Sequence, residues 1–206
     1  HHLCRGITRG LFEQYGVRMR LTNSNKKIAT KNIFLTLVLF TNALPVLAQQ
    51  VCIPSSIMPT APTEQYQQKS DGTVIDDRHR LMWKRCLEGK SGDKCEAGKL
   101  AMIDWGEALL WLGAHQNNDF AGYKNWRLPN IRELNTLTEM QCRSPAINAD
   151  VFTNAPITHV WSSSPYTFPT DYSWYVNFND GSSTYDFRHN KKALWLVRDM
   201  DTLANN

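Results

Sequence analysis

The segment Asn125–Leu134, which reads Asn-Trp-Arg-Leu-Pro-Asn-Ile-Arg-Glu-Leu, constrains the fold more than any other part of the chain. Pro129 fixes its own φ and disfavours a helical conformation for the residue before it, so the chain must arrive extended. Asn130 can then accept a backbone hydrogen bond at a helix start, and Glu133 follows at the spacing of a capping box. We predict an extended segment that leads directly into a helix from Asn130 to about Met140.

The N-terminal part has the features of an export signal. Within residues 19–48, a basic stretch precedes the apolar run Ile33–Phe40, and Ala48 offers a cleavage position. Met19 is the natural initiator, so we interpret residues 1–18 as an upstream extension. The apolar run is shorter than the roughly 18 residues of a spanning helix. We therefore expect a mature protein without a membrane span, exported to the periplasm, the cell surface or the medium.

Removal of the signal changes the charge of the protein. Seven of the 23 Lys and Arg residues and one of the 19 acidic residues lie in residues 1–48, which leaves 16 basic and 18 acidic residues. The formal net charge becomes −2, compared with +4 for the whole chain. Nucleic-acid binding depends on a strong positive charge, so we expect no nucleic-acid partner.

Four cysteines remain after residue 48: Cys52, Cys86, Cys95 and Cys142. In an exported protein they predict two disulfides, for which three pairings exist. Cys86 and Cys95 flank a polar, glycine-containing loop, which favours that local pair and leaves Cys52 with Cys142. The alternative is a zinc site, but no Cys-x-x-Cys spacing occurs, and we assign no metal to the cysteines.

The first half of the mature chain combines a polar arm with a hairpin and a helix. Residues 49–70 are rich in Pro, Ser, Thr and Gln, and we interpret them as a flexible arm before a domain at residues 71–199. Thr73–Ile75 and Leu81–Trp83 predict the strands of a hairpin. A helix should begin at Asp104, because apolar residues recur after it at helical spacing.

The second half has the pattern of strands. Trp174–Asn179 alternates apolar and polar residues, Asp180-Gly181 is a turn signal, and Thr184–Phe187 should form the returning strand. Ala193–Val197 is apolar on both faces, which predicts a central strand. The fold class expected is α+β, with two helices packed on a small antiparallel sheet and stabilised by disulfides.

In this order, the motifs resemble the C-terminal domain of the Legionella collagen-like adhesin, the Lcl C-terminal domain family. The segments that carry the resemblance are Asp71–Asp76, Leu81–Cys86, Asn125–Leu134, Pro145–Asn148, Trp161–Ser164, Trp174–Gly181 and Leu196–Arg198. The resemblance implies a C-type-lectin-like fold, more distantly similar to the formylglycine-generating enzyme fold. For the collagen-like adhesin it implies binding to host glycosaminoglycans.

Two groups of residues are candidates for ligand binding. Asn177, Asn179 and Asp180 carry oxygen atoms of the kind that calcium or sugar hydroxyls bind, although they also suit an exposed strand and its turn. Tyr166, Tyr172 and Tyr185 lie in turn-rich sequence, where exposed rings could contact a ligand, whereas most tryptophans occupy core positions. Apart from calcium at the first group, we expect no cofactor.

No catalytic set is recognisable. Arg127 lies in the loop before the second helix and Glu133 in the capping box, which indicates structural roles, and the histidines are scattered. We therefore expect a non-catalytic lectin-like domain that binds a glycan or a surface protein in adhesion or envelope interaction. One alternative is an exported enzyme of the formylglycine-generating group, which would need free active-site thiols. The other is a structural subunit of a pilus or secreted complex. The oligomeric state does not follow from the sequence.

Overall fold

A computed structural model describes residues 50–55, 57–114 and 119–200. The predicted signal peptide at residues 19–48 and the extension at residues 1–18 lie outside the described residues. Within these residues, the α+β class is confirmed, with helices α1 and α2 and a larger share of strands. The C-type-lectin-like topology stays a prediction.

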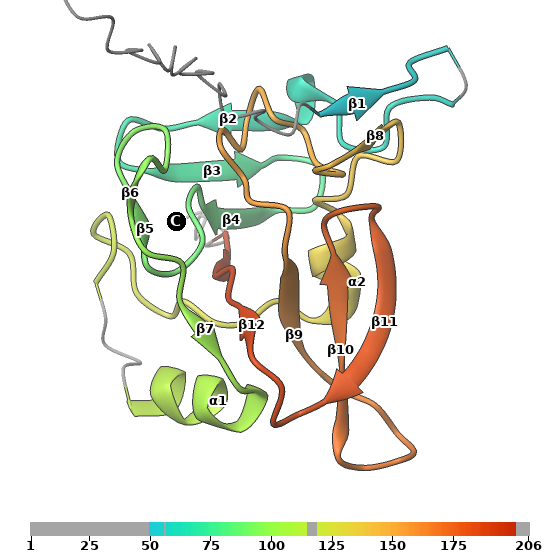
Figure 1. Ribbon diagram of the computed structural model, residues 1–206. Coiled ribbons are helices and arrows are strands. Elements are labelled where there is room, and N and C mark those ends of the chain that lie inside the picture. Colours follow the sequence, from blue (N-terminus) through green and yellow to red (C-terminus); the bar gives the residue numbers. More distant parts are fainter. Residues whose placement is uncertain (1–49, 56, 115–118, 201–206) are drawn as a thin grey trace, which may run out of the picture. The chain divides into compact units, whose positions relative to one another are not determined.

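The larger sheet has five strands in the order β11-β10-β9-β12-β7 (Figure 1). Their bounds are β7 Met102–Ile103, β9 His159–Pro165, β10 Tyr172–Asn177, β11 Ser182–Phe187 and β12 Lys192–Ala193. Strands β9, β10 and β11 form an antiparallel meander, of which the sequence predicts the β10–β11 hairpin. Strand β12 pairs with β9 in parallel, so the sheet is mixed rather than purely antiparallel.

The second sheet has four strands in the order β13-β4-β3-β2 and contains the predicted N-terminal hairpin. Its strands are β2 Tyr66–Gln68, β3 Thr73–Asp76, β4 Leu81–Lys84 and β13 Val197–Asp199. Two short ribbons, β1 with β8 and β5 with β6, complete the described strands. Their bounds are β1 Val51–Cys52, β5 Lys90–Ser91, β6 Ala97–Gly98 and β8 Cys142–Arg143.

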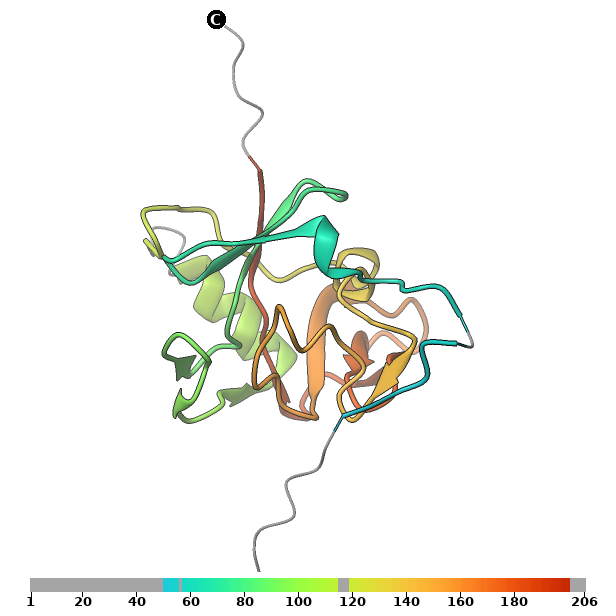
Figure 2. The same cartoon turned by 90° about the horizontal axis from the view of Figure 1, so that it is seen from above.

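The segment Ala193–Val197 differs from its prediction as one central strand. Strand β12 ends at Ala193 in the five-stranded sheet, and β13 begins at Val197 in the other sheet. Between them Leu194, Trp195 and Leu196 are at most 2% exposed, and Figure 2 shows this segment running on from one sheet to the other. The prediction was wrong because an apolar run indicates burial on both sides but not which strands will flank it.

Helix α1, Trp105–Ala114, begins as predicted after Asp104, whose Oδ1 accepts the Glu107 N–H at 2.8 Å. Helix α2, Ile131–Asn135, also begins as predicted but ends well before Met140. The hydroxyls of Thr136 and Thr138 donate to the carbonyls of Glu133 and Asn135 at 2.7 and 2.8 Å. A longer helix would need those carbonyls for its own N–H groups, so the threonines favour its end.

Residues 49–70 were predicted to form a flexible arm. The part of this segment that the structure describes is attached to the domain. It contributes β1, the 3-10 helix η1 at Thr63–Gln65 and β2, and it buries Ala61 and Tyr66 completely or nearly so. The Glu139 carboxylate accepts the Ala61 N–H at 2.9 Å. This attachment depends on contacts almost 80 residues apart, which the polar composition of the arm does not indicate.

Both predicted disulfides are present, Cys52 with Cys142 and Cys86 with Cys95. The core agrees with the expectation that tryptophans act as anchors, since Trp83, Trp161 and Trp195 are at most 1% exposed. Two clusters of apolar side chains make up this core, and α1 contributes the fully buried Ala108 to the second one. Among the described residues, neither helix has the length and hydropathy that a bilayer crossing requires.

Candidate functional site

Aromatic side chains gather on one face of the β10–β11 hairpin. Trp174 lies directly opposite Tyr185, and Tyr172 lies directly opposite Phe187. Because side chains alternate between the two faces of a strand, both pairs lie on the same face. We call this group, together with Tyr166 at the start of the loop between β9 and β10, the aromatic surface.

The rings of the aromatic surface contact one another in a continuous row. Tyr166 and Tyr185 are stacked with their centroids 3.9 Å apart and their planes 20° apart. Tyr185 packs edge-on against Trp174 at 5.8 Å and against Tyr172 at 5.7 Å. Tyr172 continues the row to Phe187 at 4.1 Å. Mutual packing therefore orients the rings before any ligand arrives.

The aromatic surface lies where the cover of the sheet ends. Helix α2 contacts β9 and β10, and the Ser183 hydroxyl of β11 donates to Asn135 Oδ1 of α2 at 2.6 Å. Val176, across from Ser183, is fully buried. Farther along the same hairpin, Tyr185 and Phe187 are 42% and 37% exposed. One sheet face thus passes from core to solvent while remaining apolar, which is typical of an interaction site.

The phenol groups of Tyr166 and Tyr172 keep their protons at physiological pH. The hydroxyl of Tyr185, followed by partial burial, raises the pKa of Tyr166 above its usual value. Partial burial and then the carboxylate of Asp171 raise the pKa of Tyr172. Neutral phenols can both donate and accept hydrogen bonds. The surface therefore combines flat apolar rings with polar groups at their edges.

The opposite face of β11 is held by a buried ion pair. Lys192 Nζ lies 2.5 Å from Asp186 Oδ2, and the lysine side chain is only 4% exposed. The same ammonium lies 4.1 Å from the Tyr175 ring centroid and 4.7 Å from that of Trp161. These contacts compensate the charge of a buried lysine, and they fix the strand that carries Tyr185 and Phe187.

The second predicted group, Asn177, Asn179 and Asp180, forms the end of the β10–β11 hairpin. Asn177 Oδ1 accepts the Asn179 N–H at 3.0 Å, and Asp180 Oδ1 accepts the Ser182 hydroxyl at 2.7 Å. This hydroxyl and the Ser182 N–H lower the pKa of Asp180. In the part of the chain that the structure describes, no three His, Cys, Asp or Glu side chains are grouped closely enough to hold a metal ion.

Asn177 and Asn179 also line a shallow hollow of about 330 Å³ with His159. Burial, followed by the charge of Lys192, lowers the pKa of His159, so this imidazole is neutral at physiological pH. Asp180 does not belong to the lining of this hollow. The two asparagines are thus brought together with a histidine, whereas the third predicted oxygen ligand stabilises the turn.

A comparison with protein families places most of the folded part in one of them. The family model of the Lcl C-terminal domain matches residues 72–198. The chain belongs to the Lcl C-terminal domain family. This is a family of adhesin-like domains, and its matched region extends from the start of the N-terminal hairpin to β13. A comparison with curated proteins gives no match.

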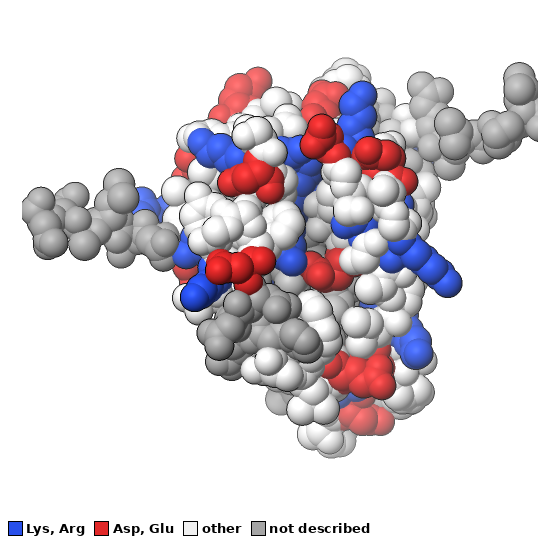
Figure 3. All heavy atoms as spheres, turned by 90° about the vertical axis from the view of Figure 1, so that its left-hand side faces the viewer, with Lys and Arg blue, Asp and Glu red and all other residues white. Residues whose placement is uncertain are grey.

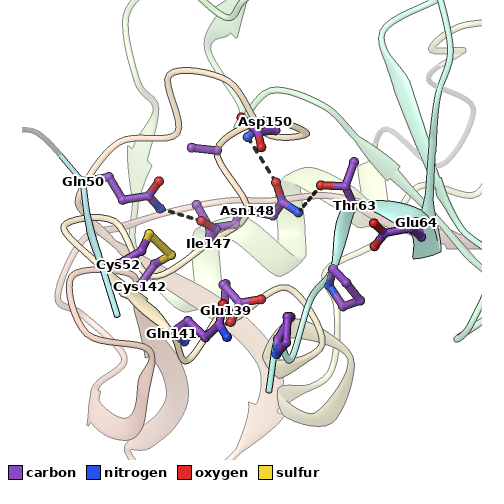
Figure 4. A pocket seen from close by; sticks show the side chains of 13 residues that line it. Gln50, Cys52, Thr63, Glu64, Glu139, Gln141, Cys142, Ile147, Asn148 and Asp150 are labelled. Carbon is purple, nitrogen blue, oxygen red and sulfur yellow. Dashed lines mark hydrogen bonds between the residues drawn. A yellow bond between two sulfur atoms is a disulfide. The ribbon is translucent and has the colours of Figure 1, made fainter. Parts of the chain in front are cut away.

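Another hollow, of about 300 Å³, lies between the Lcl C-terminal domain and the segment that precedes it (Figure 4). The carboxyl groups of Glu64, Glu139 and Asp150 line it, without a basic side chain among its lining residues. Glu139 is only 5% exposed, and it accepts hydrogen bonds from the backbone N–H groups of Thr60, Ala61 and Gln141. The bonds from Thr60 and Ala61 attach the arm, so Glu139 has a structural role that no local sequence signal indicates.

The Arg127–Glu133 pair has the structural role that the sequence predicts. Glu133 Oε2 accepts the Asn130 N–H at 2.7 Å, which completes the capping box, and it lies 2.8 Å from Arg127 Nη1. Arg127 also contacts Asp199 at 2.7 Å and so connects the loop before α2 to β13. These three charges join secondary-structure elements of the Lcl C-terminal domain.

The structure brings together the three tyrosines that the sequence singles out. It adds the rings of Trp174 and Phe187, which the sequence does not mark as site residues. Trp174 was expected in the core, but it is only half-buried and packs against Tyr166 at 5.3 Å. Phe187 was seen only as part of a strand. Tyr172 and Trp174 are two residues apart on one strand, as are Tyr185 and Phe187 on the next, and this spacing was the signal in the sequence. It shows that the four rings share one face only when the strand register is known.

Proposed function

We propose that this protein is an exported, non-catalytic binding domain that recognises a glycan on its aromatic surface. The observation that carries the proposal is the row of mutually packed, half-exposed rings on β10 and β11. The membership of the chain in a family of adhesin-like domains supports a role in adhesion or envelope interaction.

A glycan fits this surface better than a purely apolar partner does. The C–H face of a sugar ring can stack on an aromatic ring, while its hydroxyls need hydrogen-bonding partners nearby. Tyrosine supplies both from one rigid side chain, and three of the five rings are tyrosines. The net charge of −2 after the predicted cleavage gives no general attraction for polyanions. Figure 3 likewise shows acidic and basic side chains interspersed on one face of the molecule.

The chemistry of the cysteines and charged residues supports binding rather than catalysis. All four cysteines in the described residues are joined in disulfides, which favours an oxidising compartment outside the cytosol. An enzyme of the formylglycine-generating type would need free thiols. Arg127 and Glu133, the nearest approach to an acid–base pair in the sequence, bind each other and the start of α2.

The test compares glycan binding by the protein with that of Tyr185 variants. Tyr185→Ala should weaken binding to the glycans recognised on an array by about 5- to 150-fold, because we take stacking of a sugar face on the ring to be comparable to base–aromatic stacking, which contributes about 1–3 kcal/mol. Tyr185→Phe keeps the ring and should retain most of the affinity. Binding constants would come from titration calorimetry with the best glycan of the array.

Leu110→Ala is a suitable control, since Leu110 is 76% exposed and lies on α1 rather than on the hairpin. It should leave glycan affinity unchanged. Equal losses for Leu110→Ala and Tyr185→Ala would contradict the proposal, as would folded protein that binds no glycan on the array.

A further inference from the structure

Strand β11 is an open sheet edge of unusual length for this domain. It lies at the end of the five-stranded sheet and is the outermost strand on that side of Figure 1. Among the other edges of the two large sheets, as far as the chain is described, β7 has two residues and β2 has three. The β13 edge exchanges backbone hydrogen bonds with Arg127 at Val197. Of the sheet edges in the described residues, β11 alone offers six consecutive residues to a further strand.

The register identifies which backbone groups of β11 point outward. The Arg188 N–H donates to the Asp171 carbonyl next to β10 at 2.9 Å, so even-numbered residues direct their backbone groups inward and odd-numbered residues outward. Phe187 already satisfies both of its groups, through Asp186 Oδ1 and the Asn190 N–H. Ser183 and Tyr185 therefore retain outward N–H and C=O groups that have no protein partner among the described residues.

Nothing on β11 repels an additional strand. Sheet edges are commonly protected by proline, by lysine or by a bulge, and β11 contains neither of those residues. Its one charged side chain, Asp186, lies on the face opposite Tyr185 and is engaged by Lys192. The edge is thus neutral and uninterrupted.

We propose that a second copy of this chain pairs with β11 in antiparallel orientation around a two-fold axis at Thr184. In this register Ser183 lies opposite Tyr185 of the partner subunit, and Thr184 lies opposite its own counterpart. Four backbone hydrogen bonds then use the free groups of both copies. The nearby charges are engaged within each copy, because Asp180 accepts from Ser182 and the Arg188 guanidinium donates to the Tyr172 carbonyl and lies over the Trp105 ring. The pairing therefore depends on backbone groups.

The self-complementary spacing is the reason to favour a second copy over an unrelated strand. The two residues with free backbone groups, Ser183 and Tyr185, are symmetric about Thr184, so one copy supplies each donor and acceptor that the other needs. Pairing would place two aromatic surfaces on one face of a continuous sheet. An edge contact of this length buries less than the roughly 1,200–2,000 Å² of a stable interface, so the dimer should be reversible. It does not depend on what the aromatic surface binds.

The first measurement is sedimentation velocity of the full chain over a wide concentration range, without ligand. We expect a monomer–dimer equilibrium that Ser183→Pro abolishes, because proline removes an outward N–H that the fold does not use. Ser183→Ala keeps that N–H and loses only the hydroxyl contact with Asn135, so it should dimerise like the unchanged protein. Association that persists in Ser183→Pro, or that is absent at every concentration, would overturn the proposal.

A second measurement does not depend on how well the proline variant folds. Directly opposed residues in a non-hydrogen-bonded pair have their Cα atoms about 4.5 Å apart, so Thr184→Cys should form a disulfide-linked dimer under mild oxidation. Ser182→Cys is the control, because residue 182 faces Asp186 of the partner subunit and not itself. Cross-linking at 182 but not at 184 would rule out the register, and peptide mapping would verify that the native disulfides are retained.

Discussion

At the scale of single residues, the ion pair between Lys192 and Asp186 helps to position the exposed rings on the other face of β11. The lysine is enclosed by Trp161, Tyr175 and Asp186. Burial raises the pKa of Asp186, but hydrogen bonds from Lys192, the Phe187 N–H and Asn190 together outweigh burial and lower that pKa below its usual value. Asp186 lies between Tyr185 and Phe187 in the strand, so the ion pair on one face fixes the two rings on the other.

Asp186→Asn should lower the free energy of unfolding by about 3 kcal/mol at neutral pH, because it leaves a buried ammonium without its counter-ion. A carboxyl with a lowered folded-state pKa contributes stability that is present above its unfolded pKa of about 3.9 and is lost as the pH falls through the folded value. The protein should therefore lose more stability between pH 7 and pH 3 than the variant does. Urea denaturation at both pH values measures the difference.

Asp171→Asn is the matched control. Asp171 is exposed and lies in the loop before β10, and the substitution should change the free energy of unfolding by no more than about 0.5 kcal/mol. Equal effects of the two substitutions would show that the Lys192–Asp186 pair does not stabilise the hairpin.

At the scale of elements, helix α2 depends on its caps because it has only five residues. An isolated helix of that length is not stable in water. Asn130 Oδ1 accepts the N–H groups of Arg132 and Glu133 at 2.9 and 3.0 Å, and the threonines after the helix bind its last carbonyls. The remaining support comes from Leu134, which is fully buried against the main core cluster.

Asn130→Ala should lower the free energy of unfolding by about 1 kcal/mol, since it removes the side-chain acceptor at the helix start. Asn130→Asp keeps that acceptor and should be nearly neutral. Thermal or urea denaturation of both variants decides the matter. If the aspartate variant were as unstable as the alanine variant, the cap would not be the reason for the loss.

At the scale of the whole domain, the two disulfides close loops of very different length. Cys52 and Cys142 are 90 residues apart in sequence, whereas Cys86 and Cys95 are 9 apart. The longer bridge attaches the segment before the matched family region to the domain, beside the bonds from Glu139. The shorter one closes a local loop that also contains β5.

Replacing Cys52 and Cys142 together by alanine should cost about 4–5 kcal/mol of stability, compared with about 2–3 kcal/mol for the pair Cys86 and Cys95. The reason is that a cross-link removes more unfolded-state entropy when it closes a longer loop. Guanidinium denaturation of the two double variants gives both values. The reverse order would mean that strain or residual structure, rather than loop length, governs their contribution.

The features that the sequence predicted correctly depend on local chemistry. Pro129 and Asn130 restrict the backbone and supply a cap within a few residues, so the start of α2 follows from the sequence. The same holds for the hairpin turn at Asp180-Gly181. Polar loop composition likewise favoured the local disulfide between Cys86 and Cys95.

Only the tertiary structure decided which remote segments meet. The arm is held by Glu139, and the run at Leu194–Leu196 passes between two sheets instead of forming one strand. Turn-rich sequence pointed to Tyr185 as a surface ring, but that Trp174 and Phe187 lie beside it on a face that passes from the buried Val176 to solvent follows only from the strand register. Backbone restrictions act over a few residues, whereas burial depends on which distant element covers a face, and this is why the site could be only partly predicted.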